Sequence, residues 1–150
     1  MNKVSLRIVD RDNFNDVIDL ELRDDQKDYV ADNSYSLAES KFFPSCQPRA
    51  IYLGDKVVGF LMYESIEKED KPNEYDIFRF MVDHRFQAQG VGRQAMSLAL
   101  EEIKRMPQVE RITICYVPTN PVAKNFYSSF GFQEVGINEE DGEMIAEICL

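Results

Sequence analysis

A glycine turn at residues 87–93 is the first place where the chain could do chemistry. It consists of Gln87, Ala88, Gln89, Gly90, Val91, Gly92 and Arg93, between a β-prone run and a segment with helical periodicity. Glycines at a strand-to-helix junction let main-chain N–H groups surround a phosphate, and the helix N-terminus adds partial positive charge. Because many loops contain a Gly-x-Gly, the turn predicts a phosphate site only together with a second motif.

A second candidate segment lies near the other end of the chain, at residues 120–127. It contains Asn120, Ala123, Lys124 and Tyr127 directly after a β-prone run at residues 111–117. Asn120 can cap the helix that follows, and Tyr127 lies on the face that this helix would bury. Taken together, the two segments indicate an enzyme.

Alternating strand and helix patterns must position these two segments. The apolar periodicity and the turn residues give the order strand–helix–helix–strand–strand–strand, then helix–strand–helix–strand–strand. A strand at residues 75–82 leads into the glycine turn, and an amphipathic helix at residues 91–106 follows it. We therefore expect one α/β domain over residues 1–150, with a mixed central sheet of about seven strands flanked by about four helices.

Several local boundaries follow from turn chemistry. Residues 65–73 are charged and contain Pro72, which predicts a flexible hairpin loop, whereas the acidic residues 24–34 remain unassigned. A Gly54-Asp55 turn predicts a hairpin between residues 49–53 and 57–63. The expected helix caps are Asp10 or Asp12, a capping box of Ser36 and Glu39, and Thr119 or Asn120.

Composition limits the class of partner. The formal net charge is −10, which disfavours nucleic acid and anionic membranes as partners and suits a cationic small substrate. No apolar run reaches the roughly 18 residues of a membrane span, and the N-terminus lacks the apolar stretch of a signal peptide. Cys46, Cys115 and Cys149 are widely spaced, without metal-ligand spacing. We therefore expect reduced thiols, no metal site and a cytoplasmic location.

With both motifs in order, the chain resembles the GCN5-related N-acetyltransferase (GNAT) superfamily over residues 4–137. The acyl-CoA signature Gln/Arg-x-x-Gly-x-Gly/Ala is matched by Gln87, Gly90 and Gly92. The later Asn-x-x-Ala-x-x-x-Tyr pattern is matched by Asn120, Ala123 and Tyr127. The resemblance implies a GNAT-type sheet splayed at an acetyl-CoA site. It also implies an enzyme that moves the acetyl group of acetyl-CoA to a primary amine.

The resemblance also assigns roles to residues. Tyr127 is implied as the general acid that protonates the departing thiolate of CoA. Main-chain groups of the strand and N–H groups of the turn are implied to hold the cofactor. The implied cofactor residues are Phe80, Met81, Val82, Gln87, Ala88, Gln89, Gly90, Val91, Gly92, Arg93, Asn120 and Lys124.

Some positions depart from the superfamily pattern. Gln89 replaces a basic residue often found before the first motif glycine, so Arg93 and Lys124 are expected to supply positive charge instead. Cys115 stands where some members place an acid, which leaves Glu74 and Asp76 as candidate general bases or as ligands for a cationic substrate. His84 replaces a frequent proline, so we expect a turn role for it.

The acceptor amine is the least defined part of the interpretation. Within the superfamily, residues 26–30, 58–63 and 79–83 resemble bacterial spermine/spermidine N-acetyltransferases of the Bacillus type. Asp24 and Asp28, with Glu21 and Asp25, would then line the site of a polyamine, or else form a solvated helix face. The alternatives are an antibiotic or a protein amine as acceptor, or an acyl-CoA-binding sensor without catalysis. Small members of the superfamily are often homodimers.

Overall fold

The computed structural model describes residues 3–120 and 122–150. Within these ranges it contains seven strands, four α-helices and three short 3₁₀ helices, in the strand and helix order predicted above. No helix of the described residues is long and apolar enough to cross a membrane. The strands are β1 (Val4–Ile8), β2 (Cys46–Leu53), β3 (Lys56–Ile66), β4 (Lys71–Val82), β5 (Arg111–Tyr116), β6 (Gln133–Ile137) and β7 (Met144–Cys149). The helices are α1 (Phe14–Ile18), α2 (Asn33–Phe42), α3 (Val91–Lys104), α4 (Ala123–Ser128), η1 (Asp24–Tyr29), η2 (Glu67–Glu69) and η3 (His84–Phe86).

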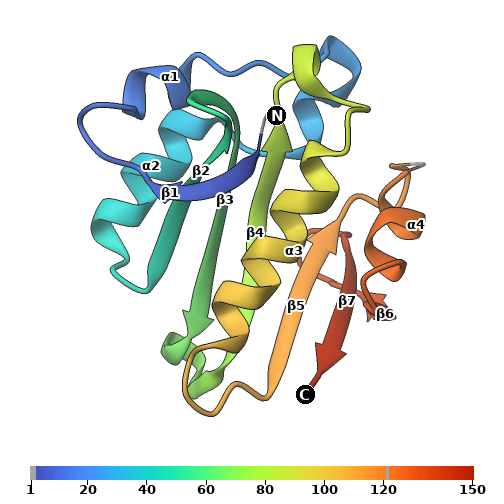
Figure 1. Ribbon diagram of the computed structural model, residues 1–150. Helices are drawn as coiled ribbons and strands as arrows, with labels where there is room; N and C mark the ends of the chain where they lie inside the picture. The colour runs from blue at the N-terminus through green and yellow to red at the C-terminus, as the bar shows by residue number, and fades with distance from the viewer. Residues whose placement is uncertain (1–2, 121) are drawn as a thin grey trace.

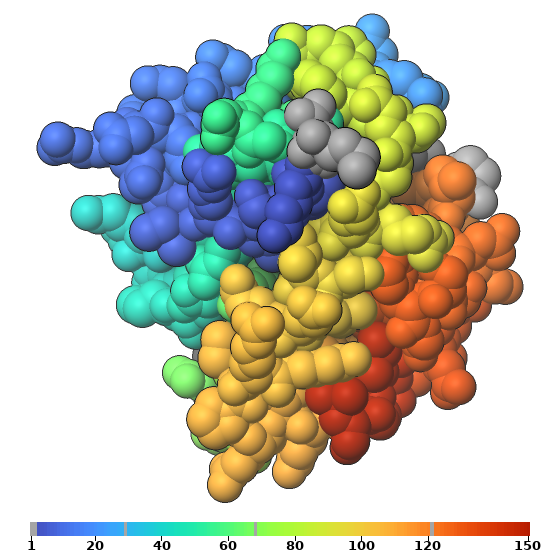
Figure 2. All heavy atoms as spheres, viewed as in Figure 1, coloured from blue at the N-terminus to red at the C-terminus, as the bar shows by residue number. Residues whose placement is uncertain are grey.

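The strands form one sheet in the order β1-β2-β3-β4-β5-β7-β6, which confirms the expected mixed sheet. Only β4 and β5 pair in parallel among the described strands. One apolar cluster includes Val91, Ala95 and Met96 of α3, and a second includes Val17 of α1. Figure 1 shows α3 lying across the near face of the sheet. In the space-filling view its side chains, in yellow, cover the middle of that face (Figure 2).

The sheet opens between β4 and β5. Only residues 74–77 of β4 pair with residues 111–114 of β5, although β4 continues to Val82. The pairing of β4 with β3 shifts at the same level, where Met62 opposes Arg79 and Tyr63 opposes Ile77. Phe78 is therefore an extra residue, a β-bulge, and bulges bend a strand and increase its twist. Figure 1 shows the two strands diverging from this level toward their C-terminal ends.

Two predicted boundaries are wrong. The helix α2 begins at Asn33, so Ser36 lies inside it and its hydroxyl donates to the carbonyl of Asp32 at 3.2 Å. The predicted capping box fails because Asn33, Ser34 and Tyr35 already belong to the first turn of α2. The predicted loop at residues 65–73 is also too long, because β3 extends to Ile66 and β4 begins at Lys71. Charged residues are tolerated there on the solvated end of a long hairpin.

The other expected caps act just ahead of their helices. Asp10 Oδ1 accepts the N–H groups of Asp12 and Asn13, at 2.9 and 3.1 Å, in the turn before α1. Asn120 Oδ1 accepts the N–H of Val122 at 3.3 Å, whereas the N-cap position of α4 is Val122 itself. Both side chains thus shape the turn that leads into a helix without occupying its cap.

Candidate functional site

The glycine turn leaves the N-terminus of α3 open to a ligand. Gly90 precedes α3 with a φ of 81°, in the left-handed region that glycine adopts without strain. No side chain among the described residues caps α3, so the N–H groups of its first turn stay available to an anion. Gly92 follows, and a Cβ at its position would meet Phe80 and Val82 at 3.8 Å. Residues 88–93 therefore form an N–H-rich turn packed on the end of β4.

Arg93 brings a positive charge to the same end of α3. Its Nη1 donates to the hydroxyl of Ser129 at 3.0 Å, and its guanidinium lies 5.0 Å from the ring centre of Phe130. Lys124 pairs instead with Glu134 at 3.6 Å. The charge of Arg93 is therefore exposed in the first turn of α3. The charge of Lys124 is partly offset by a carboxylate.

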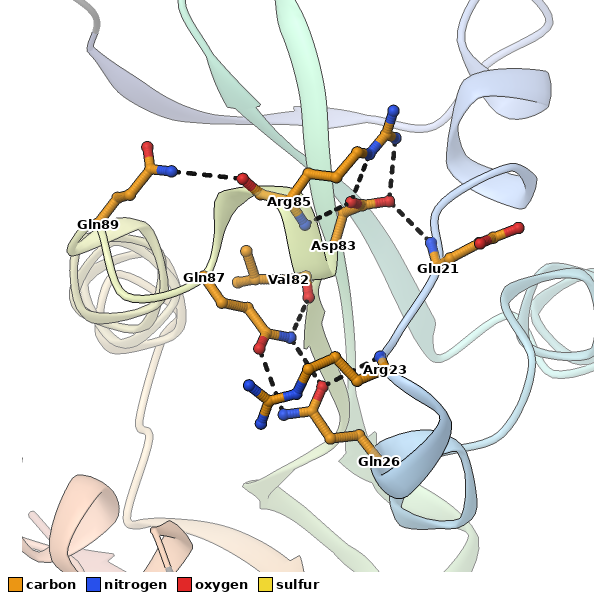
Figure 3. A network of polar contacts seen from close by, with 8 residues as sticks. All are labelled: Glu21, Arg23, Gln26, Val82, Asp83, Arg85, Gln87 and Gln89. Carbon is orange, nitrogen blue, oxygen red and sulfur yellow. Dashed lines mark hydrogen bonds and ion pairs between the residues drawn. The ribbon is translucent and has the colours of Figure 1, made fainter.

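The side chain of Gln87 joins the end of β4 to η1, as Figure 3 shows. Its Nε2 donates to the carbonyl of Val82 at 2.9 Å and to Oε1 of Gln26 at 3.0 Å. Gln26 Nε2 donates back to Gln87 Oε1 at 3.3 Å. The side chain of Gln87, a predicted cofactor residue, is thus used in hydrogen bonds within the protein. Only its main-chain groups are left for a ligand.

Asp83 connects the end of β4 to the segment just before η1 (Figure 3). Its buried carboxylate accepts the N–H of Glu21 at 2.8 Å, the N–H of Arg85 at 3.0 Å and the Arg85 guanidinium at 2.9 and 3.1 Å. Although burial alone would raise its pKa, these donors lower the pKa of Asp83 to about 2. His84 lies in the resulting η3 turn, as predicted. Asp83 has no predicted role, because its only signal in the sequence is an acid immediately after a strand.

The main chain of Phe80 faces the opening between β4 and β5. The N–H of Asp83 donates to Val58 of β3 at 2.8 Å, whereas the carbonyl of Val82 accepts from Gln87 on the other side. Since main-chain groups alternate between the two sides of a strand, those of Met81 point toward β3 and those of Phe80 toward β5. Because β5 no longer pairs beyond Ile77, the N–H and C=O of Phe80 are open to a ligand.

A cavity of about 480 Å³ lies at the point where β4 and β5 diverge, and we name it the acceptor cavity. Its walls come from β4, the end of β5, the segment around η1 and the loop between β6 and β7. Four carboxylates line it, against one cation, Arg79, which pairs with Glu39 at 3.4 Å. The lining residues are Asp28, Val30, Ala31, Asp76, Phe78, Arg79, Cys115, Asn138, Asp141 and Glu143.

Asp76 has the electrostatic properties of a base in this cavity. It is half-buried, and desolvation of its carboxylate raises its pKa to about 6, against the lowering effect of a hydrogen bond from Thr113 at 2.8 Å. Burial also raises the pKa of Glu143, with a further contribution from Asp141, and that of the Cys115 thiol to about 12. At neutral pH Asp76 is thus largely ionised yet able to take a proton.

The predicted acidic residues separate into two groups. Asp28 and Asp76 both line the acceptor cavity. Glu74 pairs with Arg111 at 2.9 Å and Asp24 with Lys27 at 3.0 Å, and neither lines that cavity. Sequence reasoning missed Asp141 and Glu143, because residues 138–143 have the composition of an ordinary solvated turn.

Tyr127 lies on the other face of the sheet from the acceptor cavity. Its ring stacks on Tyr116 with centres 5.5 Å apart and meets Phe132 edge-on at 6.1 Å, within the cluster that packs on α3. The neighbouring Cys115 lines the acceptor cavity instead, since successive residues of a strand point to opposite faces. Burial raises the pKa of Tyr127 to about 12, so the phenol stays protonated at neutral pH.

Comparisons with known proteins agree with this fold and identify the family. The model of the acetyltransferase (GNAT) family matches residues 14–132. A spermine/spermidine N(1)-acetyltransferase of Bacillus subtilis (strain 168) is 26% identical over 145 residues, covering 95% of both chains.

Two solved structures have the same fold. One is the PaiA N-acetyltransferase of Thermoplasma acidophilum in complex with coenzyme A, with a TM-score of 0.74, 13% identity and 99% coverage of both chains. The other is the aminoglycoside acetyltransferase AAC(6')-Ib in complex with coenzyme A, with a TM-score of 0.78, 17% identity and coverage of 98% of this chain and 95% of that one.

Proposed function

The chain belongs to the acetyltransferase (GNAT) family and is an acetyl-CoA-dependent N-acetyltransferase, and on that premise we propose that its acceptor is a linear polyamine or diamine. The charge of the acceptor cavity is the observation that carries the proposal. Arg79 is the one cation in its lining and is paired with Glu39, whereas four carboxylates line it: Asp28, Asp76, Asp141 and Glu143. A negative cavity concentrates cations, and polyamines carry several ammonium groups. The relative from Bacillus subtilis, whose name includes spermine and spermidine, supports the same acceptor class.

The cofactor site that we propose lies in the opening between β4 and β5. The N–H groups of residues 88–93 and the charge of Arg93 suit the diphosphate of CoA, because the uncapped N-terminus of α3 favours anions. The open N–H and C=O of Phe80 suit amide groups of the pantetheine arm, with Asn120 near the start of α4. Acetyl-CoA supplies the acetyl group as a thioester, which is activated toward amines.

Two residues on opposite faces of this opening have complementary roles in our proposal. Asp76 takes a proton from the amine in the acceptor cavity, directly or through a water, because most alkylamines are protonated at neutral pH. The amine nitrogen forms the new bond to the acetyl carbon as the bond from that carbon to sulfur breaks. Tyr127 donates its phenolic proton to the departing sulfur, and the second proton that the nitrogen loses as the neutral amide forms restores the phenol through water. The proton held by Asp76 passes to solvent. This division of roles agrees with a raised pKa for Asp76 and a protonated Tyr127.

The test is an acetyl-CoA consumption assay with spermine, spermidine, short diamines, an aminoglycoside and a lysine peptide. We expect polyamines to give the highest kcat/KM. The variant Asp28→Asn should raise the KM for spermidine, whereas Asp25→Asn is the matched control, because Asp25 pairs with Arg23 and does not line the acceptor cavity. Acetylation of the peptide or the aminoglycoside alone would contradict the proposed acceptor. Binding of acetyl-CoA without acetylation of any amine would favour a sensor.

A further inference from the structure

A second cavity, of about 360 Å³, adjoins the acceptor cavity, and we name it the distal cavity. Most of its lining surface is polar and includes the carboxylates of Glu21 and Asp32, although six apolar residues also contribute. Lys27 is the one cation among the lining residues, and Asp24 compensates its charge at 3.0 Å. The lining residues are Ile18, Leu20, Glu21, Leu22, Lys27, Val30, Ala31, Asp32, Asn33, Ser34 and Met81.

The two cavities follow one another along β4. Both are lined by Val30 and Ala31, which form their common wall. On β4 the acceptor cavity is lined by Asp76, Phe78 and Arg79, and the distal cavity by Met81. Phe78 and Met81 both pack with the cluster on the α1 side of the sheet, so both cavities lie on that face. The path from Phe78 to Met81 spans roughly 10 Å of extended strand, or about nine main-chain bonds. The path from Asp76 to Met81 includes the bulge and spans at most roughly 16 Å, or about fifteen main-chain bonds.

We propose that the two cavities form one groove for a linear amine, an inference that rests on the polyamine function proposed above. The reacting amine lies in the acceptor cavity beside Asp76, and the aliphatic chain passes Val30 and Ala31. The far ammonium lies in the distal cavity, beside Glu21 and Asp32. A chain of about nine to fifteen bonds between its end nitrogens, which covers a triamine such as spermidine and a tetraamine such as spermine, fills this path. A short diamine reaches only the acceptor cavity.

The first experiment measures kcat/KM across a series of amines of increasing length: a short monoamine, diamines of three to six carbons, and spermidine. We expect kcat/KM to rise with length and to be highest for the triamine. The variant Ser34→Phe fills the distal cavity from an exposed position, so it should lower kcat/KM for spermidine about tenfold and leave the short diamine unchanged. Ala38→Phe is the matched control, because Ala38 is exposed on the same helix and lines neither cavity.

The second experiment tests the charges without adding volume. The double variant Glu21→Gln/Asp32→Asn should raise the KM for spermidine about threefold to tenfold at unchanged kcat, since exposed ion pairs contribute modestly. The control is Asp19→Asn, which removes an exposed carboxylate at the end of α1 outside both cavities. Calorimetric binding of spermidine in the presence of CoA gives the same comparison without turnover.

The outcomes separate this inference from the proposed function. If short diamines and spermidine are acetylated equally well, and neither distal-cavity variant changes their ratio, the groove is refuted while the polyamine function stands. If no polyamine is acetylated although another amine is, the proposed function fails and the groove fails with it.

Discussion

At the scale of single residues, Asp76 and Tyr127 combine shifted pKa values with positions on opposite faces of the opening between β4 and β5. Desolvation raises both pKa values, to about 6 for Asp76 and about 12 for Tyr127, with opposite chemical results. The carboxylate becomes a better proton acceptor near neutrality, and the phenol is kept protonated. Such pairs of titratable groups with separated pKa values are typical of acid–base sites.

Replacing Tyr127 tests the proposed acid. We expect Tyr127→Phe to lower kcat by about 10²-fold or more, the usual contribution of general acid catalysis. The calorimetric affinity for acetyl-CoA should stay nearly constant, because the ring keeps its contacts with Tyr116 and Phe132. Unchanged kcat in this variant would exclude the phenol as a required proton donor.

The raised pKa of Asp76 leads us to expect that kcat/KM depends on pH. Because the ionised carboxylate accepts the proton, kcat/KM should fall as pH decreases through about 6, the pKa of Asp76. In Asp76→Asn this acidic limb should disappear, together with most of the activity. A pH profile of both proteins checks this expectation. An identical acidic limb in the variant would show that another group titrates.

At the scale of elements, the approach of β3 to β4 fixes the strand on which the cofactor site is built. Gly59 of β3 faces the end of β4, and a Cβ there would lie 2.6 Å from the main-chain oxygen of Met81 and 3.0 Å from Ile51 Cδ1. No side chain fits without moving the strands apart. The main chain of Phe80, one residue away, moves with them.

We therefore expect Gly59→Ala to lower the free energy of unfolding by about 1–3 kcal/mol, as overpacking does. The affinity for acetyl-CoA should weaken in parallel, because the end of β4 is displaced. Urea unfolding and calorimetry measure the two effects. A variant with the stability and affinity of the wild type would show that β3 and β4 separate without cost.

Asp83 connects the segment before η1 to the end of β4. The variant Asp83→Asn loses a carboxylate that accepts two main-chain N–H groups and a guanidinium, so at pH 7 we expect destabilisation of about 1–3 kcal/mol. Its folded-state pKa is lowered from 3.8 to about 2, so its contribution is present above pH 4 and is lost as pH falls toward 2. Urea unfolding should therefore show the variant and wild type converging at low pH. A difference that stays constant down to pH 2 would contradict this assignment.

At the scale of the whole molecule, the net charge of −10 acts on the rate of substrate encounter. Salt screens the attraction between an acidic protein and a polycation, so kcat/KM for spermidine should fall several-fold between low and moderate ionic strength. A monoamine with a single charge should depend less on salt. Rates measured against salt concentration for both amines test this. Equal salt dependence of kcat/KM for the two amines would show that the charges of the protein do not attract spermidine more strongly than the monoamine.

Much of the fold was readable from local patterns. The order of strands and helices and the glycine turn before α3 follow from periodicity and turn residues, which act over a few positions of the chain. The start of α2 at Asn33 and the extended hairpin around η2 did not follow, because tertiary packing overrides the weak local preferences of the polar residues there.

The sequence by itself determined the family motifs of this protein, because Gln87, Gly90, Gly92, Asn120, Ala123 and Tyr127 stand at spacings set by one turn and one helix. Only the tertiary structure decided which carboxylates share a cavity. Asp28, Asp76, Asp141 and Glu143 meet there from three distant segments, while Glu74 and Asp24 are taken by ion pairs. The sequence also did not predict the bulge at Phe78. Nor did it predict the hydrogen bonds of Gln87 and Asp83 to residues about sixty positions away in the chain. Such contacts depend on how the sheet bends and which loops close over it, and no local pattern encodes that.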